Sequence, residues 1–193
     1  MKKRIFTFAV VVICISILAS TTLAYFTDTD TARNVITSGG VDIAIEEWQQ
    51  TDSGLVSYPK DKPIAVMPAT TVSKIVTVKN HDAQSFIRVK LELTIKDSTG
   101  KEMSLSAAEL EKIIHLITNT QDWTEKDGWW YYGAAVNTNE ATLPLMTAVE
   151  FDGPNMTNEY QRSTLKIHVI AQAVQTANNG TTALEALGWS EAE

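Results

Sequence analysis

Metal chemistry needs clustered ligands, and the chain has three histidines, His81, His115 and His168. A helical zinc-protease site places two histidines one turn apart with a glutamate beside the first, and the sequence contains no such HExxH pattern. Glu111 and His115 are four residues apart on an expected helix, so both could face one ion. Such a pair is far more often a solvated helix face. We therefore predict no metal site and no cofactor.

The sequence also contains no pattern typical of nucleophilic catalysis. The one cysteine, Cys14, lies in an N-terminal apolar run and would be removed with it. Residues 28–31 (DTDT) resemble an aspartyl-phosphate loop but lack the buried strand that holds such a carboxylate, and there is no GxSxG or phosphate-cradling glycine loop. Asp122, Glu125 and Asp127 could bind calcium weakly, although loop carboxylates are usually solvated. We predict no catalytic residue and no enzyme activity.

The most unusual local composition is aromatic. Trp129, Trp130, Tyr131 and Tyr132 follow one another, and successive side chains of a strand point to opposite faces. One pair of rings should pack in the core, and the other pair is either covered by the inserted helix or exposed. An exposed pair would be a contact surface for carbohydrate stacking or for another subunit.

Composition excludes several other classes of protein. The chain has 193 residues with 16 Lys and Arg against 23 Asp and Glu, a net charge of -7. This acidic balance argues against nucleic-acid binding, which needs a basic face. A single cysteine excludes a disulfide framework, and the length fits one domain.

The N-terminus has the layout of a secretory signal peptide. Basic residues 2–4 precede an apolar run over residues 5–18, and small residues follow as far as Ala24. The run is shorter than the roughly 20 residues of a spanning helix, although an uncleaved anchor over residues 5–24 is an alternative. We expect residues 1–24 to be removed between Ala24 and Tyr25. The product would be secreted to the cell surface or exterior, with membrane contact only before cleavage.

Alternating polar and apolar residues after Gly40 predict antiparallel strands. The clearest case is 86–97, and further strands are expected over 41–48, 72–80, 129–132, 145–151 and 165–174. A capping box from Ser106 to Glu109 precedes apolar residues at helical spacing and predicts one inserted helix over about 107–118. A short second helix is expected over 182–187. Residues 40–193 are thus predicted to form a mainly β domain, an antiparallel β-sandwich with one inserted helix.

Several short motifs stand out along the chain. They are residues 23–28 (LAYFTD), 32–34 (ARN), 36–43 (ITSGGVDI), 67–69 (MPA), 86–89 (FIRV), 129–132 (WWYY), 142–145 (TLPL) and 167–175. Together they resemble one family of exported proteins, the camelysin/TasA-type matrix proteins of Gram-positive bacteria. The resemblance is most specific at the N-terminus and looser through 97–121. The later motifs lean toward the clostridial pilin-like members, whose signals are cleaved by a SipW-type signal peptidase.

The resemblance implies a jelly-roll-like sandwich that assembles into extracellular fibres of a biofilm matrix. The expected partners are the SipW-type signal peptidase, further copies of the chain joined head to tail, and other matrix subunits. A physical route is strand donation, in which residues 25–39 leave their own subunit and complete the sheet of the next one. Tyr25, Phe26, Val35 and Ile36 are the expected assembly residues.

Two other functions compete with a fibre subunit. A monomeric surface adhesin or carbohydrate-binding module would use the aromatic stretch at 129–132. The family also contains members described as metalloproteases, but this sequence departs from any helical zinc motif, which makes that activity the remotest alternative.

Overall fold

The computed structural model describes residues 35–37, 41–59 and 62–190, which belong to one compact unit over 31–193. Its elements in chain order are β1 (Val35–Thr37), β2 (Ile43–Thr51), β3 (Gly54–Ser57), β4 (Ile64–Ala65), β5 (Thr71–Asn80), β6 (Ser85–Lys96), α2 (Ala107–Ile113), β7 (Ile114–Thr118), β8 (Trp123–Lys126), β9 (Trp129–Tyr132), β10 (Met146–Phe151), the 3-10 turn η1 (Asn158–Tyr160) and β11 (Thr164–Gln175). All six strands predicted from the periodicity are present; the strand over 129–132 has the predicted ends, and the others are shifted at one or both ends.

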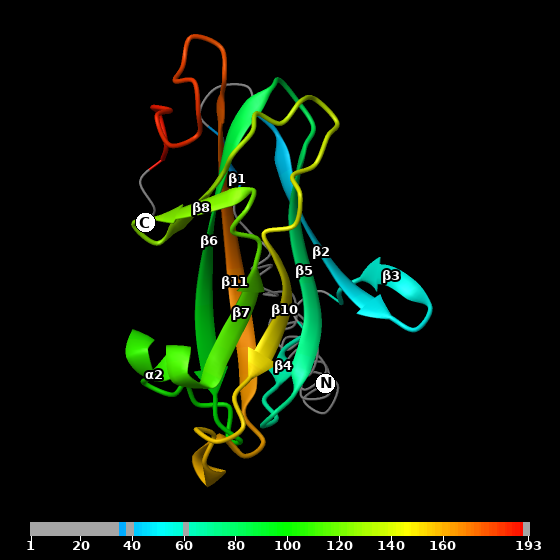
Figure 1. The fold of residues 1–193 in the computed structure, drawn as a ribbon, viewed down its shortest axis with the longest axis vertical. Helices are drawn as coiled ribbons and strands as arrows, with labels where there is room; N and C mark the ends of the chain where they lie inside the picture. The colour runs from blue at the N-terminus through cyan, green and yellow to red at the C-terminus, as the bar shows by residue number, and fades with distance from the viewer. Residues whose placement is uncertain (1–34, 38–40, 60–61, 191–193) are drawn as a thin grey trace, which may run out of the picture. The chain divides into compact units, whose positions relative to one another are not determined.

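The strands form two sheets (Figure 1). The first has the order β1-β11-β6-β9-β8, with β4 also paired to β11, and the second has the order β3-β2-β5-β10-β7. The longest ladder joins β6 to β11 over their full lengths, from Ser85 opposite Gln175 to Lys96 opposite Thr164. In Figure 1 the β2–β3 hairpin projects away from the sandwich, and α2 lies near one end of β7.

One hydrophobic core lies between the two sheets. It contains Ile87 and Val89 of β6, Leu165 of β11, and Val76 and Val78 of β5, all fully buried. These residues occupy alternate positions in their strands, as predicted for half-buried antiparallel strands. The fold is therefore a mainly β sandwich with a single described α-helix, as the sequence predicts.

The inserted helix is shorter than predicted. Its capping box is present: Ser106 Oγ accepts from the Glu109 backbone N–H, and the Glu109 carboxylate accepts from the Ser106 backbone N–H. The helix ends at Ile113, and residues 114–118 form β7, with Ile114 opposite Phe151 of β10. Residues 114–118 are rich in β-branched side chains, and a strand lets the alternate residues reach the core, so pairing with β10 overrides the helical spacing.

The second predicted helix, over 182–187, is absent. Residues 182–187 form a single turn within a closed loop. The side chain of Asn179 closes this loop, because its Oδ1 accepts from the Leu187 backbone N–H at 2.8 Å and its Nδ2 donates to the Leu187 carbonyl at 3.1 Å. Gly180 is needed there, since a Cβ at this position would lie 2.7 Å from the Glu185 carbonyl carbon. We call residues 176–190 the C-terminal segment.

Candidate functional site

The predicted assembly segment contributes one strand to the first sheet. β1 pairs in parallel with β11, with Val35 opposite Ala171, Ile36 opposite Gln172 and Thr37 opposite Ala173. The other side of β11 is fully paired with β6, so β1 lies on the outer edge of the sheet. We call Ala171, Gln172 and Ala173 the acceptor edge. Every other strand pair among the described residues is antiparallel.

The other N-terminal predictions fall on parts of the chain that the structure leaves undescribed. The predicted signal peptide, its cleavage site between Ala24 and Tyr25, and the assembly residue Phe26 all lie outside the described residues. Within the described ranges, no helix has the length and apolar content needed to cross a membrane.

Gln172, the central residue of the acceptor edge, belongs to a row of paired residues that crosses the whole sheet. Each member is the Cα partner of the next on the neighbouring strand, from β1 through β11, β6 and β9 to β8. The row is Ile36, Gln172, Arg88, Tyr131 and Thr124. The middle of β1 therefore lies level with Arg88, two strands away.

Arg88 makes the densest set of polar contacts in this row. Its Nε and Nη2 both donate to Gln172 Oε1, at 2.9 and 2.7 Å, and its Nη1 donates to the Tyr131 hydroxyl at 3.1 Å. Nη2 also donates to the Ser190 carbonyl at 3.0 Å. All these acceptors are neutral, and together they hold the planar guanidinium in one orientation.

Aromatic rings cover the faces of the same guanidinium. Its Cζ lies 4.1 Å from the ring centroid of Trp129, 4.7 Å from that of Trp189 and 5.9 Å from that of Tyr131. Such cation–π contacts are attractive by about 0.5–2 kcal/mol each, depending on how far the site is desolvated. Arg88 therefore joins the outer face of the sheet to the C-terminal segment. We call Arg88, Gln172, Trp129, Trp189 and Ser190 the arginine clasp.

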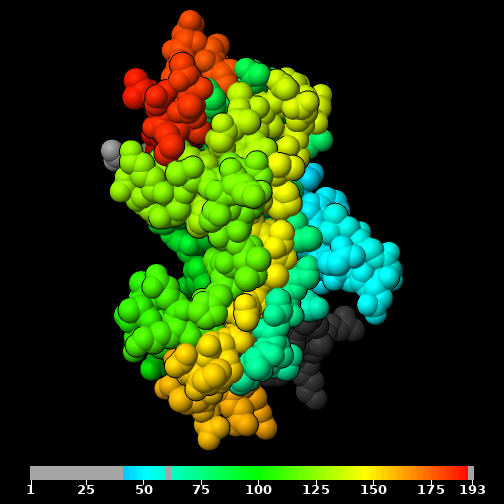
Figure 2. Space-filling model, viewed as in Figure 1, coloured from blue at the N-terminus to red at the C-terminus, as the bar shows by residue number. Residues whose placement is uncertain are grey.

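The aromatic stretch divides between the two faces of the sheet as predicted. Trp130 and Tyr132 pack against the main core, and Tyr132 lies 4.9 Å from the buried ring of Trp123. Trp129 and Tyr131 lie on the opposite face, where Trp129 is only 9% exposed. The C-terminal segment packs against Tyr131, and Arg88 lies over the Trp129 ring, in place of the inserted helix or solvent that the sequence suggested. In Figure 2 that segment, in orange to red, packs beside residues coloured yellow-green.

The covering contact is a small second core on the outer face. It is formed by Phe86 and Val174 from the sheet and by Ala183 and Ala186 from the C-terminal segment, with Tyr131 and Trp189 packed against them. The rings of Tyr131 and Trp189 meet edge to face with centroids 6.0 Å apart. Each of the four rings of this stretch therefore makes contacts within the chain itself.

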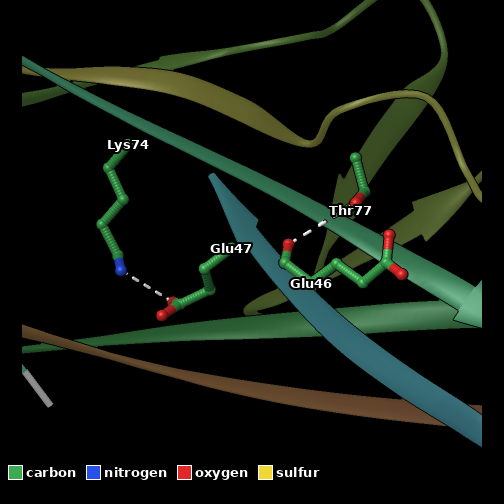
Figure 3. A network of polar contacts seen from close by, with 4 residues as sticks. All are labelled: Glu46, Glu47, Lys74 and Thr77. Carbon is green, nitrogen blue, oxygen red and sulfur yellow. Dashed lines mark hydrogen bonds and ion pairs between the residues drawn. The ribbon is translucent and has the colours of Figure 1, made fainter. Parts of the chain in front are cut away.

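An ion pair inside the sandwich was missed by the sequence reasoning. Lys74 on β5 and Glu47 on β2 point toward one another, with Nζ 2.8 Å from Oε1 (Figure 3). The Lys74 side chain is 5% exposed and that of Glu47 is 26% exposed. The Lys74 ammonium also lies 4.0 Å from the ring centroid of Tyr58. Burial raises the pKa of the Tyr58 hydroxyl, and the negative charge of Glu47 raises it further.

The signal for this ion pair was present in the periodicity. Lys74 occupies the same phase of the β5 alternation as Val72, Val76 and Val78, so it must face the core. A lysine at such a position needs a buried acidic partner. The partner could not be identified without the pairing of β2 with β5, which places Glu47 opposite Val76.

The histidines weighed for chemistry are spread over the fold, whereas Asp122, Glu125 and Asp127 lie at β8 and the turn that follows it. His115 lies on β7, beyond the end of the helix, so it shares no helix face with Glu111. His168 Nδ1 lies 3.7 Å from Glu92 on the outer face of the first sheet. Within the described residues, no three or more His, Cys, Asp or Glu side chains gather in a way that could hold a metal ion.

The fold and site together define a β-sandwich whose outer edge is completed by a strand from the N-terminal segment. Comparison of the chain with protein-family models, with curated proteins and with solved structures finds no match.

Proposed function

We propose that the chain is a secreted structural subunit of extracellular fibres, which assembles by N-terminal strand donation after signal cleavage. One observation carries this proposal: β1 comes from the predicted donor segment and pairs with β11 at the edge of the first sheet. A strand at this edge is held mainly by main-chain hydrogen bonds, which any copy of the same segment can make in the same register.

Exchange of β1 between copies would give a chain of subunits. Because β1 of one copy would pair with β11 of the next, the donor and acceptor surfaces differ, and such a heterologous contact propagates when it does not close into a ring. The exchange replaces one pairing with an identical one, so its free-energy difference comes from the connecting residues and from new contacts between subunits. A parallel pair of three residues also has little to hold it in place, which favours release.

The aromatic stretch supports the fibre subunit over the carbohydrate-binding alternative. Sugar stacking needs an open ring face, whereas Arg88 covers one face of Trp129 and the C-terminal segment covers Tyr131.

The test compares the predicted mature chain, residues 25–193, with a shorter chain, residues 39–193, by negative-stain microscopy and analytical ultracentrifugation. Filaments are expected only from the longer chain. A synthetic peptide of residues 25–38 should bind the shorter chain and keep it monomeric. Filaments from the shorter chain, or monomers from both chains, would refute self-assembly by strand donation, and the latter result would favour the adhesin.

A double variant tests whether pairing of β1 with β11, and not merely the length of the chain, is required for filaments. Successive residues of a strand point their N–H groups to opposite sides, so the double substitution Val35→Pro and Ile36→Pro removes a donor facing β11. We expect it to abolish filaments. Ile36→Val, the matched control, keeps the backbone N–H and the β-branched shape and should assemble as the unmodified chain does.

A further inference from the structure

We propose that Arg88 is the positioning residue of the acceptor edge, and that the C-terminal segment controls through Arg88 how readily β1 leaves its own sheet. This inference rests on the proposed function, because it concerns the strand that would be exchanged. It adds a second segment, from the opposite end of the chain, to the control of assembly.

Arg88 is linked to the acceptor edge through Gln172. Gln172 is the central residue of that edge and lies opposite Ile36 of β1. Its side chain is 1% exposed, and its Oε1 accepts two hydrogen bonds from Arg88, at 2.9 and 2.7 Å. Two charge-assisted bonds to one buried amide fix the side chain of the residue against which β1 is registered.

The same side-chain amide has only part of its hydrogen bonds formed. Gln172 Nε2 is buried and has no hydrogen-bond partner among the described residues. Arg88 is therefore the group that makes burial of this side chain tolerable. Without Arg88, both polar atoms of the amide would be buried and unpaired, and such groups are costly enough to favour local opening toward water. The end of β11 that opens is the end that carries β1.

The position of the Arg88 guanidinium depends in turn on the C-terminal segment. The Ser190 carbonyl accepts from Nη2, and Trp189 covers the guanidinium at 4.7 Å. These two residues follow directly on the loop that Asn179 closes, so the loop holds them over the sheet. Release of the segment would expose the outer face around Phe86 and Val174 and would free Arg88 to leave Gln172.

The experiment measures amide hydrogen exchange by mass spectrometry on monomers of residues 25–193 at low concentration. Arg88→Ala and Trp189→Ala should each speed exchange of residues 35–37 and 171–173 about tenfold, the factor that corresponds to about 1.4 kcal/mol. Exchange in the β2–β5 ladder should stay unchanged. Lys90→Ala is the matched control, because Lys90 lies on the same face of β6 two residues away and should leave both regions unchanged.

Two further variants separate positioning from general stability. Trp189→Phe keeps an aromatic ring and should stay within about twofold of the unmodified chain. Gln172→Glu keeps an oxygen acceptor for Arg88, replaces the unpartnered Nε2 by a second acceptor and adds an ion pair, so it should slow exchange of residues 35–37. A purely structural role for Arg88 does not predict this change of sign.

The outcomes distinguish this inference from the proposed function. Unchanged exchange at 35–37 in Arg88→Ala, or equal acceleration in every strand, would overturn the positioning role even if filaments form. Local acceleration, with faster filament growth once the concentration is raised, would support both proposals. Local acceleration in a chain that never forms filaments would support the clasp and overturn the fibre function.

Discussion

The buried ion pair of Lys74 and Glu47 allows a prediction in which two substitutions act with opposite consequences. Glu47→Gln removes one charge, keeps the side-chain shape and leaves the Lys74 ammonium in the sandwich without a counter-charge. Removing one partner of a fully buried pair typically costs 3–5 kcal/mol. Here the Glu47 side chain is 26% exposed, so water already screens part of the attraction.

Two contacts lower the expected cost further. The amide oxygen introduced by Glu47→Gln can still accept from Lys74, and the Tyr58 ring 4.0 Å from Nζ retains a cation–π attraction of about 0.5–2 kcal/mol. We therefore expect Glu47→Gln to lower the free energy of unfolding by about 2 kcal/mol. For a chain of this size the melting temperature should fall by about 4–8 °C.

The double variant Lys74→Met and Glu47→Gln should recover most of that loss. Methionine fills a similar volume and needs no counter-charge, so the double variant should lie within about 1 kcal/mol of the unmodified chain. Urea unfolding followed by tryptophan fluorescence measures the free energy of unfolding of each variant, and with Lys74→Met alone as the second single variant the double-mutant cycle gives the coupling energy.

An exposed ion pair supplies the matched control. Glu92 lies 2.7 Å from Lys90, with side chains 45% and 33% exposed, so Glu92→Gln should cost less than about 1 kcal/mol. Two results would refute the reasoning: Glu47→Gln no more costly than Glu92→Gln, or a double variant as unstable as Glu47→Gln alone. The first would mean that the pair is solvated in solution, and the second that the charge of Lys74 is not the source of the cost.

Three further predictions concern single residues. A hydrogen bond from Lys90, helped by His168, holds the pKa of Glu92 below its ordinary value of 4.5. The contribution of the Glu92 carboxylate to stability is therefore complete above pH 4.5 and is lost as the pH falls through the lowered pKa. Glu92→Gln should flatten the acid limb of a curve of stability against pH, and an unaltered limb would contradict this. Gly180→Ala should disorder the C-terminal segment, because its Cβ would lie 2.7 Å from the Glu185 carbonyl carbon, and limited proteolysis should then cut within residues 176–190 as it does not in the unmodified chain. Gly128 has φ +77°, so Gly128→Ala should lower the free energy of unfolding by about 1–2 kcal/mol in the same urea assay, and no loss would argue against this turn.

Local signals account for most of what the sequence predicted about the fold. The long strands β5, β6 and β11 each alternate over many residues, and the capping box marks the start of α2. The strand β8 was missed although Asp127-Gly128, with φ of +54° and +77°, is the two-residue signal of a tight hairpin. The end of α2 was misplaced because residues 114–118 carry both a helical and a strand pattern, and only the pairing with β10 decides between them.

The candidate site was predictable only in part for a similar reason. The aromatic stretch and the segment holding β1 stand out in the sequence by composition and by resemblance. Arg88 and Gln172 lie within two motifs of the resemblance, 86–89 and 167–175, but nothing in the local sequence marks them or Trp189 as partners of one another. Arg88 lies 84 residues before Gln172 and 102 residues before Ser190 in the chain.

The sequence by itself determined that this chain is a β-sandwich, because the alternation of apolar residues sets which face of each strand is buried, whatever its partners are. It also marked Lys74 as inward-facing. The tertiary structure alone decided that Glu47 neutralises this lysine, that β1 lies on the edge of β11, and that the C-terminal segment packs against Tyr131. The physical reason is that burial follows from each strand's own period, whereas a hydrogen bond or ion pair between distant residues exists only once the strand order and register bring them together.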